Sequence, residues 1–134
     1  MRRILSAAVV SVSVLGSTII SSGVASAHPP YRCDPNMVCL YYNSIEHGLN
    51  GIFIQSTHIP NYQNYTFDHS TSGSEGYGQT VKNNAGAVYN RLPIDFAVFY
   101  NGNYSCAVAC QKFPPFTLRN LNSVMKNNNA SGLW

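Results

Sequence analysis

Charged side chains are scarce in this sequence, and their scarcity limits the functions the chain can have. Asp, Glu, Lys and Arg make up only 10% of the 134 residues. No cluster of Lys and Arg follows the first three residues, so a nucleic-acid partner is not expected. Nucleophile-elbow and metalloprotease motifs are missing as well. The acidic residues have no spacing that singles out a catalytic pair, and we expect no enzyme. They are Asp34, Glu46, Asp68, Glu75 and Asp95.

Helical periodicity is nearly absent after Ala27, and short apolar or aromatic runs take its place. Asn and Gly separate these runs, and the pairs Asn50-Gly51 and Asn101-Gly102 predict tight hairpin turns with positive φ. Short strands at this spacing predict an all-β antiparallel sandwich or barrel. The stretch Asp68–Gln79 lacks any pattern and is predicted to be an exposed loop. The predicted strands are Val38–Tyr42, Ile52–Ile54, Val88–Tyr89, Phe96–Tyr100 and Phe116–Leu118.

The N-terminus has the three parts of a secretion signal. Met1-Arg2-Arg3 is positively charged, Ile4–Ile20 is largely apolar, and Ala25-Ser26-Ala27 is a small-x-small cleavage site. Serines and a glycine interrupt the apolar stretch, which is short for a membrane span. We therefore predict that residues 1–27 are a cleaved signal peptide and that residues 28–134 form a secreted protein without a membrane anchor.

The predicted mature chain is one domain with almost no net charge. It has 107 residues, enough to bury a single core. Six basic and five acidic residues remain after residues 1–27 are removed, which gives a net charge of about +1. We expect a monomer.

Four cysteines punctuate the predicted mature chain as Cys33-x5-Cys39 and Cys106-x3-Cys110. Export favours disulfides, and the two local pairs are favoured over the crossed ones because each closes through a single turn. Crossed pairings remain open, since four cysteines allow three connectivities. Zinc sites typically pair cysteines as Cys-x2-Cys, so these spacings argue against zinc.

Two parts of the chain repeat each other in the same order. Leu40-Tyr41-Tyr42-Asn43-Ser44 matches Val98-Phe99-Tyr100-Asn101-Gly102. Lys82-Asn83-Asn84-Ala85-Gly86-Ala87 matches Lys126-Asn127-Asn128-Asn129-Ala130-Ser131, with one more Asn in the second copy. Chance similarity in an Asn-rich chain is the alternative. The shared order favours two copies of about four strands each, which predicts a two-motif Greek-key sandwich.

These residues carry a resemblance to known families. Tyr41 followed seven positions later by Gly48 is similar to the folded hairpin of βγ-crystallin motifs. The block from Cys33 through Cys39-Leu-Tyr-Tyr-Asn-Ser44 resembles the secreted peptidase inhibitors typified by the Streptomyces metalloproteinase inhibitor. The resemblance implies a βγ-crystallin-like sandwich over residues 33–134, an extracellular metalloendopeptidase as partner, and no cofactor.

The resemblance also implies an inhibitory loop closed by the second cysteine pair. Mapped onto this chain, the loop is Cys106, Ala107, Val108, Ala109 and Cys110, with Cys106–Ala107 as the reactive bond. It is one residue shorter than the loop of the family. Ala107 is also smaller than the residue that thermolysin-like peptidases favour after the cut. Val108 would fill an apolar subsite, with Tyr104, Lys112 and Phe113 at the rim. Alternatively, the disulfide only cross-links an edge hairpin and has a structural role.

Residues outside this loop offer three other kinds of binding site. His28, the predicted mature N-terminus, has the chemistry to chelate copper together with His47, His58 or His69. The turns 83–87 and 128–132 resemble calcium turns, but Ala87 and Gly132 replace the expected Ser and no carboxylate is near, so a turn-forming role is favoured. The alternative function is a non-catalytic extracellular binding or structural module, for glycan, cell wall or weak calcium. Its candidate sugar-stacking residues are Tyr41, Tyr62, Tyr65 and Tyr77.

Overall fold

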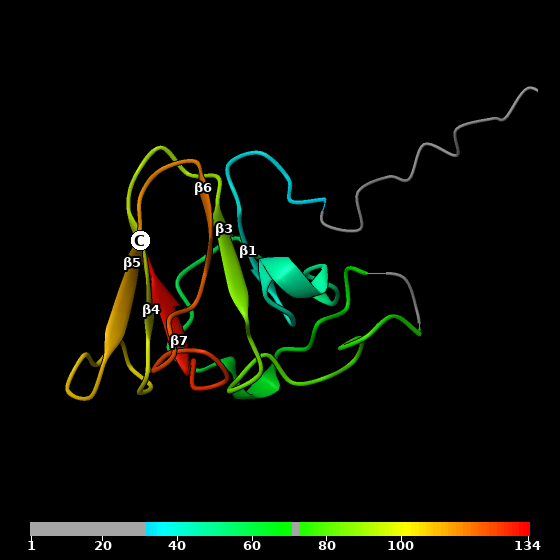
Figure 1. Cartoon of the computed structure of the whole chain (residues 1–134). Helices are drawn as coiled ribbons and strands as arrows, with labels where there is room; N and C mark the ends of the chain where they lie inside the picture. Colours follow the sequence, from blue (N-terminus) through cyan, green and yellow to red (C-terminus); the bar gives the residue numbers. More distant parts are fainter. Residues whose placement is uncertain (1–31, 71–72) are drawn as a thin grey trace, which may run out of the picture.

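Two antiparallel sheets packed face to face make up the computed structural model, which describes residues 32–70 and 73–134 (Figure 1). One sheet has the strand order β2-β1-β3-β6 and the other the order β5-β4-β7. The strands are β1 Val38–Tyr41, β2 Ile52–Gln55, β3 Ala87–Asn90, β4 Phe96–Phe99, β5 Cys110–Phe113, β6 Thr117–Asn120 and β7 Ser131–Leu133. Two 3-10 turns are present, η1 Ile45–His47 and η2 Tyr62–Asn64. The predicted all-β fold is confirmed. The predicted signal peptide and His28 lie outside the described residues.

Each half of the chain lends a segment to the sheet of the other half. β6 belongs to the second half, yet it pairs with β3 of the first half along four residues. In return Ile59, from the first half, pairs with Gly132 in β7 through two hydrogen bonds of 3.0 Å. This exchange is the connectivity of a two-motif Greek key, and it makes the two halves fold as one unit.

The Asn-rich repeats fold into matching turns. Asn84 Nδ2 donates to the carbonyls of Thr80 and Lys82, and Asn128 Nδ2 donates to the carbonyls of Val124 and Lys126. The matching residues of the two turns, Asn83 and Asn127, have φ of 62° and 58°. The six residues of each copy correspond one for one, and Asn129 takes the place of Ala85. The predicted repeat is therefore structural.

Most predicted strands coincide with observed ones, and two strands were missed. β5 has the sequence Cys-Gln-Lys-Phe and buries only Phe113, so it offers no apolar run. β7 is Ser-Gly-Leu, three residues without a β-branched side chain. Tertiary pairing with β4 on both sides makes these segments strands.

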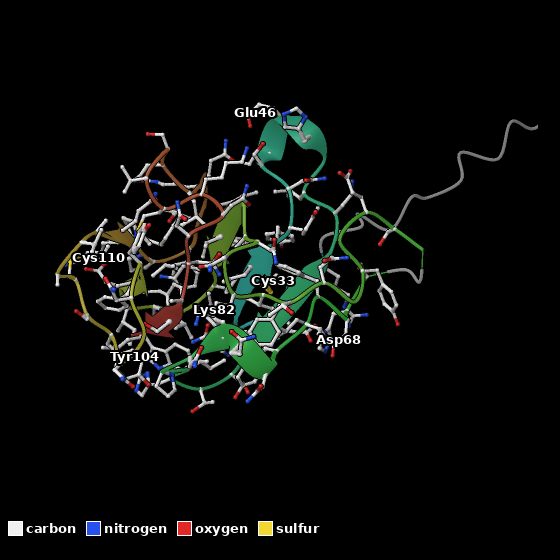
Figure 2. All side chains as sticks on the ribbon, turned by 90° about the horizontal axis from the view of Figure 1, so that it is seen from below. Cys33, Glu46, Asp68, Lys82, Tyr104 and Cys110 are labelled. Atoms are coloured by element: carbon white, nitrogen blue, oxygen red, sulfur yellow. A yellow bond between two sulfur atoms is a disulfide. The ribbon has the colours of Figure 1, made fainter. Side chains whose placement is uncertain are left out.

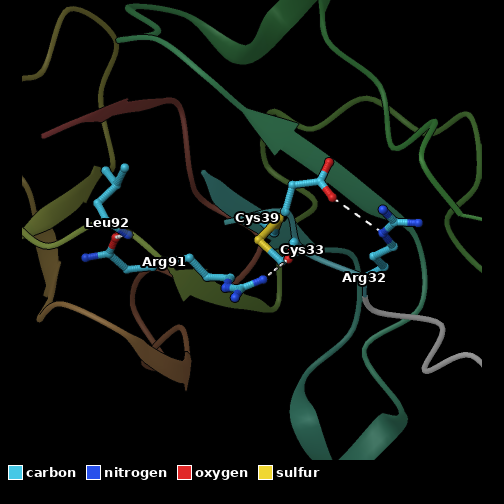
Figure 3. The surroundings of a disulfide bond; sticks show 7 residues. Arg32, Cys33, Cys39, Arg91 and Leu92 are labelled. Atoms are coloured by element: carbon cyan, nitrogen blue, oxygen red, sulfur yellow. Dashed lines mark hydrogen bonds and ion pairs between the residues drawn. A yellow bond between two sulfur atoms is a disulfide. The ribbon is translucent and has the colours of Figure 1, made fainter. Parts of the chain in front are cut away.

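The core lies between the sheets, and a smaller apolar cluster covers the outer face of β1. All four residues of β1 are buried, because Leu40 faces the main core while Cys39 and Tyr41 pack with Cys33, Leu49 and Ile52 outside it. Figure 3 shows the Cys33–Cys39 disulfide at this face, with the guanidinium of Arg91 donating to the carbonyl of Cys33. The first disulfide thus completes a packed layer.

Neither Asn-Gly pair forms the predicted tight hairpin turn, although one of the two pairs has the predicted positive φ values. Asn50 and Gly51 do have positive φ, 26° and 49°, but they end a ten-residue connection that contains η1. In the β4–β5 connection the positive φ values fall at Asn103 and Tyr104 instead of Asn101-Gly102. Each long connection is held by a hydrogen bond to a distant residue, the first from the Ile45 N–H to Asn120 and the second from the Asn103 N–H to Pro60.

Two of the four tyrosines proposed for sugar stacking are buried. Tyr41 and Tyr62 are fully inaccessible, and Tyr62 donates a 2.6 Å hydrogen bond to Gln55 Oε1 inside the core. Burial raises the pKa of both phenols. Tyr65 and Tyr77 are exposed. Within the described part of the chain no helix has the length and apolar character needed to cross a membrane.

Gly132 is the position where the two halves approach most closely, and it gives a stability prediction. A Cβ at residue 132 would lie 1.9 Å from Tyr62 Oη and 2.8 Å from Phe96 Cζ. We expect Gly132→Ala to lower the free energy of unfolding by about 1–3 kcal/mol through overpacking, measured by urea denaturation. The loss should shrink in a Tyr62→Phe background, which removes the nearest atom.

Gly102→Ala is the matched control, because its Cβ would meet nothing closer than the Pro60 carbonyl at 3.4 Å. Its effect should stay within about 0.5 kcal/mol. An equal cost of Gly132→Ala in both backgrounds would contradict the proposed clash with Tyr62.

Candidate functional site

The β4–β5 connection, residues 100–109, projects beyond the end of its sheet, below the strand ends in Figure 1. The Cys106–Cys110 disulfide, with a Cα–Cα distance of 5.1 Å, closes the tip into a small ring. Cys106, Ala107 and Cys110 are exposed, and Val108 keeps 61% of its surface accessible. The ring is a protruding loop and does not lie flat in the sheet.

Two segments from elsewhere in the chain hold the base of this loop. Ser131 Oγ in β7 donates to the Asn101 carbonyl at 2.7 Å and accepts from the Tyr104 N–H at 3.1 Å. The N–H of Asn103 donates to the carbonyl of Pro60, in the first half of the chain, at 2.8 Å. Ser131 is itself fully buried. These bonds fix residues 101–104, which lead into the ring, and the Tyr100 N–H donates to the Ala109 carbonyl at 3.0 Å across the two ends of the loop, so the exposed tip is carried on an ordered base.

Two consecutive residues in the loop have left-handed backbone conformations. Asn103 has φ of 56° and Tyr104 has φ of 60°. This region is uncommon for a bulky residue such as tyrosine and costs on the order of 1 kcal/mol or more. The bond from Tyr104 to Ser131 and the edge-on contact between the Tyr104 and Phe99 rings, 6.1 Å between centroids, hold it there. The loop path is therefore imposed by tertiary contacts.

Only one of the three residues expected at the rim adjoins the ring. Tyr104 is half-buried beside it. Phe113 is fully buried at the far end of β5 and cannot contact a partner. Lys112 is exposed, but its ammonium pairs with Asp95 at 3.4 Å, near the start of β4. The rim predicted from sequence was wrong in these two positions, because a strand carries residues 112 and 113 away from the loop.

Sequence reasoning missed a polar network that links the ring to neighbouring loops. The Gln111 side chain donates to the Asn120 carbonyl at 3.0 Å and accepts from the Asn122 N–H at 2.8 Å. The Asn120 side chain accepts from the Ile45 N–H and donates to the Glu46 carboxylate, each at 2.8 Å. The backbone N–H of Glu46 and the amide of Asn120 lower the pKa of the Glu46 carboxyl. Asn and Gln in a polar chain give no sequence signal for such contacts.

Both local disulfides form as predicted, and they lie in different environments. Cys33 and Cys39 are buried, whereas Cys106 and Cys110 are exposed. In the described residues no group of three or more His, Cys, Asp or Glu side chains is arranged to hold a metal ion. The Asn84, Asn128 and Asn129 amides of the two Asn-rich turns are engaged in hydrogen bonds within the protein, as a turn-forming role requires.

Comparison with known proteins first defines the class of fold. A solved structure described as "Evolution of the eye lens beta-gamma-crystallin domain fold" is similar with a TM-score of 0.56 over 77% of this chain and 89% of that chain, at 8% sequence identity. The chain therefore has the βγ-crystallin fold. No curated protein matches the sequence significantly.

The family follows from the sequence match. The model of "Peptidase inhibitor family I36" matches residues 26–111, which include both cysteine pairs and the whole candidate loop. The chain belongs to peptidase inhibitor family I36, and it is an inhibitor rather than an enzyme. The resemblance drawn from Cys33–Ser44 is confirmed at this level.

The two disulfides should differ in what they contribute to stability. Each closes a small loop, worth about 2 kcal/mol in the chain-entropy model. Replacing Cys33 and Cys39 with Ala also empties a packed site, so that variant should lose more stability than the Cys106→Ala, Cys110→Ala variant. Both should remain folded. Urea denaturation of the two variants measures the difference, and a larger loss from the exposed pair would contradict this assignment.

Ser131 should control the order of the loop base. Ser131→Ala leaves the Tyr104 N–H and Asn101 carbonyl without their partner, which we expect to cost about 1–3 kcal/mol. Amide hydrogen exchange at Tyr104 should accelerate at the same time. The control is Ser105→Ala, which removes only a 3.3 Å bond from the Ala107 N–H at the exposed tip. Unchanged exchange at Tyr104 in Ser131→Ala would contradict the anchoring role.

Proposed function

We propose that this chain inhibits an extracellular metalloendopeptidase by inserting the Cys106–Cys110 ring into its cleft like a substrate, with Cys106–Ala107 as the reactive bond. The observation that carries the proposal is the exposed, disulfide-closed ring on an anchored base in a member of an inhibitor family. The proposal includes export by residues 1–27, removal of that signal, and action of residues 28–134 as a monomer.

Preorganisation supplies the affinity in this mechanism. The ring and its anchored base have already lost most of the conformational entropy that a flexible substrate loses on binding. More of the contact energy is then retained as binding free energy. A rigid loop with one apolar anchor therefore binds tightly without a large interface.

The disulfide also limits the consequence of cleavage. If the peptidase hydrolyses the Cys106–Ala107 bond, the new carboxylate of Cys106 and the new amine of Ala107 stay connected through Cys110 and the disulfide. The two ends remain close, and religation competes with release. The catalytic metal of the peptidase polarises the scissile carbonyl, and the inhibitor supplies no catalytic group of its own.

Val108 is the proposed anchor. It is the large apolar side chain of the ring, with 61% of its surface exposed, and it follows the small Ala107. A peptidase with a narrow subsite for Ala107 and an apolar subsite for Val108 fits this order of residues. We therefore assign to the target peptidase a preference for a small residue directly after the cleaved bond and a larger apolar residue at the next position.

Replacing Val108 with Asp tests this assignment. A hot-spot anchor carries about 2–4 kcal/mol, so inhibition should weaken by about a hundredfold. The melting temperature should scarcely change, because the side chain is exposed. Inhibition constants of residues 28–134 and of the variant are measured against thermolysin-like, astacin-like and serine peptidases.

Ile94→Asp is the matched control for charge and exposure, since Ile94 is 50% exposed at the opposite end of β4. It should inhibit like the parent chain. Absence of inhibition by the parent chain at micromolar concentration across the panel would refute the proposal. Inhibition that Val108→Asp leaves unchanged would refute the site while keeping the function.

A further inference from the structure

Three exposed aliphatic side chains lie at the same end of the sandwich on three different loops. Val108 is on the ring, Val124 follows β6 with 51% of its surface exposed, and Ile45 in η1 is 43% exposed. The loops share this end because strands β1, β4 and β6 all run toward it. These strands end at Tyr41, Phe99 and Asn120. The ring is therefore not an isolated apolar feature.

The three loops are held in fixed positions relative to one another. Gln111, one residue after the ring, hydrogen-bonds to the backbone of Asn120 and Asn122. Asn120 in turn bonds to Ile45 and Glu46. Figure 2 views this end of the molecule and shows the orange segment that follows β6 between the labelled Cys110 and Glu46. Hydrogen bonds therefore connect the three loops in series, from the residue after the ring through the loop of Val124 to that of Ile45.

A five-residue ring alone is smaller than a stable inhibitor interface. Peptidase–inhibitor complexes bury about 800 Å² on each partner, over about 20 residues or more. A peptidase seated on the ring must therefore contact neighbouring loops. The 44–47 and 121–124 loops are tied to the ring, and both present exposed aliphatic side chains.

Resting on the function proposed above, we propose that Ile45 and Val124 form a secondary contact surface for the same peptidase, beside its catalytic cleft. The partner surface is apolar and lies on one side of the cleft, in the direction that leads from β5 across β6 to η1. Two other exposed apolar side chains, Ile94 and Phe116, lie at the opposite end of β4 and β5. A strand of four residues spans about 13 Å, which separates them from a peptidase on the ring.

The test uses a peptidase that the parent chain inhibits. Val124→Asp and Ile45→Asp should each weaken inhibition about tenfold, the size expected for an apolar contact outside the central anchor. Ile94→Asp adds the same charge at similar exposure and should leave inhibition unchanged. Melting temperatures of the three variants should agree with that of the parent chain.

Hydrogen exchange of the unsubstituted complex gives a second measurement, independent of whether a variant folds. Amides in residues 44–48 and 121–126 should gain protection on binding, and those in residues 91–95 should not. If Val108→Asp weakens inhibition while Val124→Asp and Ile45→Asp do not, and these segments gain no protection, the secondary surface is refuted and the inhibitory ring stands. If the parent chain inhibits no peptidase, both proposals fall.

Discussion

The reciprocal hydrogen bonds between the two Asn-rich turns determine where every other part of this molecule lies. The Asn83 N–H donates to the Asn129 carbonyl at 2.8 Å, and the Asn127 N–H donates to the Ala85 carbonyl at 3.0 Å. The buried Asn129 side chain adds two more bonds across the same junction, to the Ala85 N–H and the Val81 carbonyl. Buried polar groups must be paired, so these contacts admit one relative placement of the two motifs. That placement brings both long hairpin connections to one end of the sandwich.

The residues that form the core are largely different from those that form the tip of the proposed inhibitory ring. The sandwich buries its apolar side chains between the sheets and under the first disulfide, and Ala109 packs against the edge of that core, whereas Ala107 and Val108 are exposed. Ala107 and Val108 stay exposed on a loop base that Ser131 and Pro60 anchor.

The two disulfides illustrate this division with nearly identical covalent chemistry. Both join cysteines that are close in sequence, so both restrict the unfolded chain to a similar and modest extent. Cys33–Cys39 packs against Tyr41, Leu49 and Ile52 and completes a layer over β1. Cys106–Cys110 packs against little and instead shapes an exposed ring. Their environment, and not the bond itself, gives them different roles.

The sequence by itself predicted the all-β fold and the repeat, favoured the two local disulfides over the crossed pairings, and through the family resemblance indicated the ring. Short apolar runs, the Asn-rich repeat and close cysteine spacing are local signals, and short-range physics enforces them. Only the tertiary structure decided that β5 and β7 are strands, that Tyr41 and Tyr62 are buried, and that Lys112 and Phe113 point away from the ring. It also decided that Gln111 and Asn120 hydrogen-bond the loops of Ile45 and Asn122 to the start of β5, next to the ring. Those outcomes depend on contacts between residues far apart in the chain, and no local sequence pattern indicates such contacts. An Asn or Gln residue gives the same sequence pattern whether its side chain binds water or a distant backbone group.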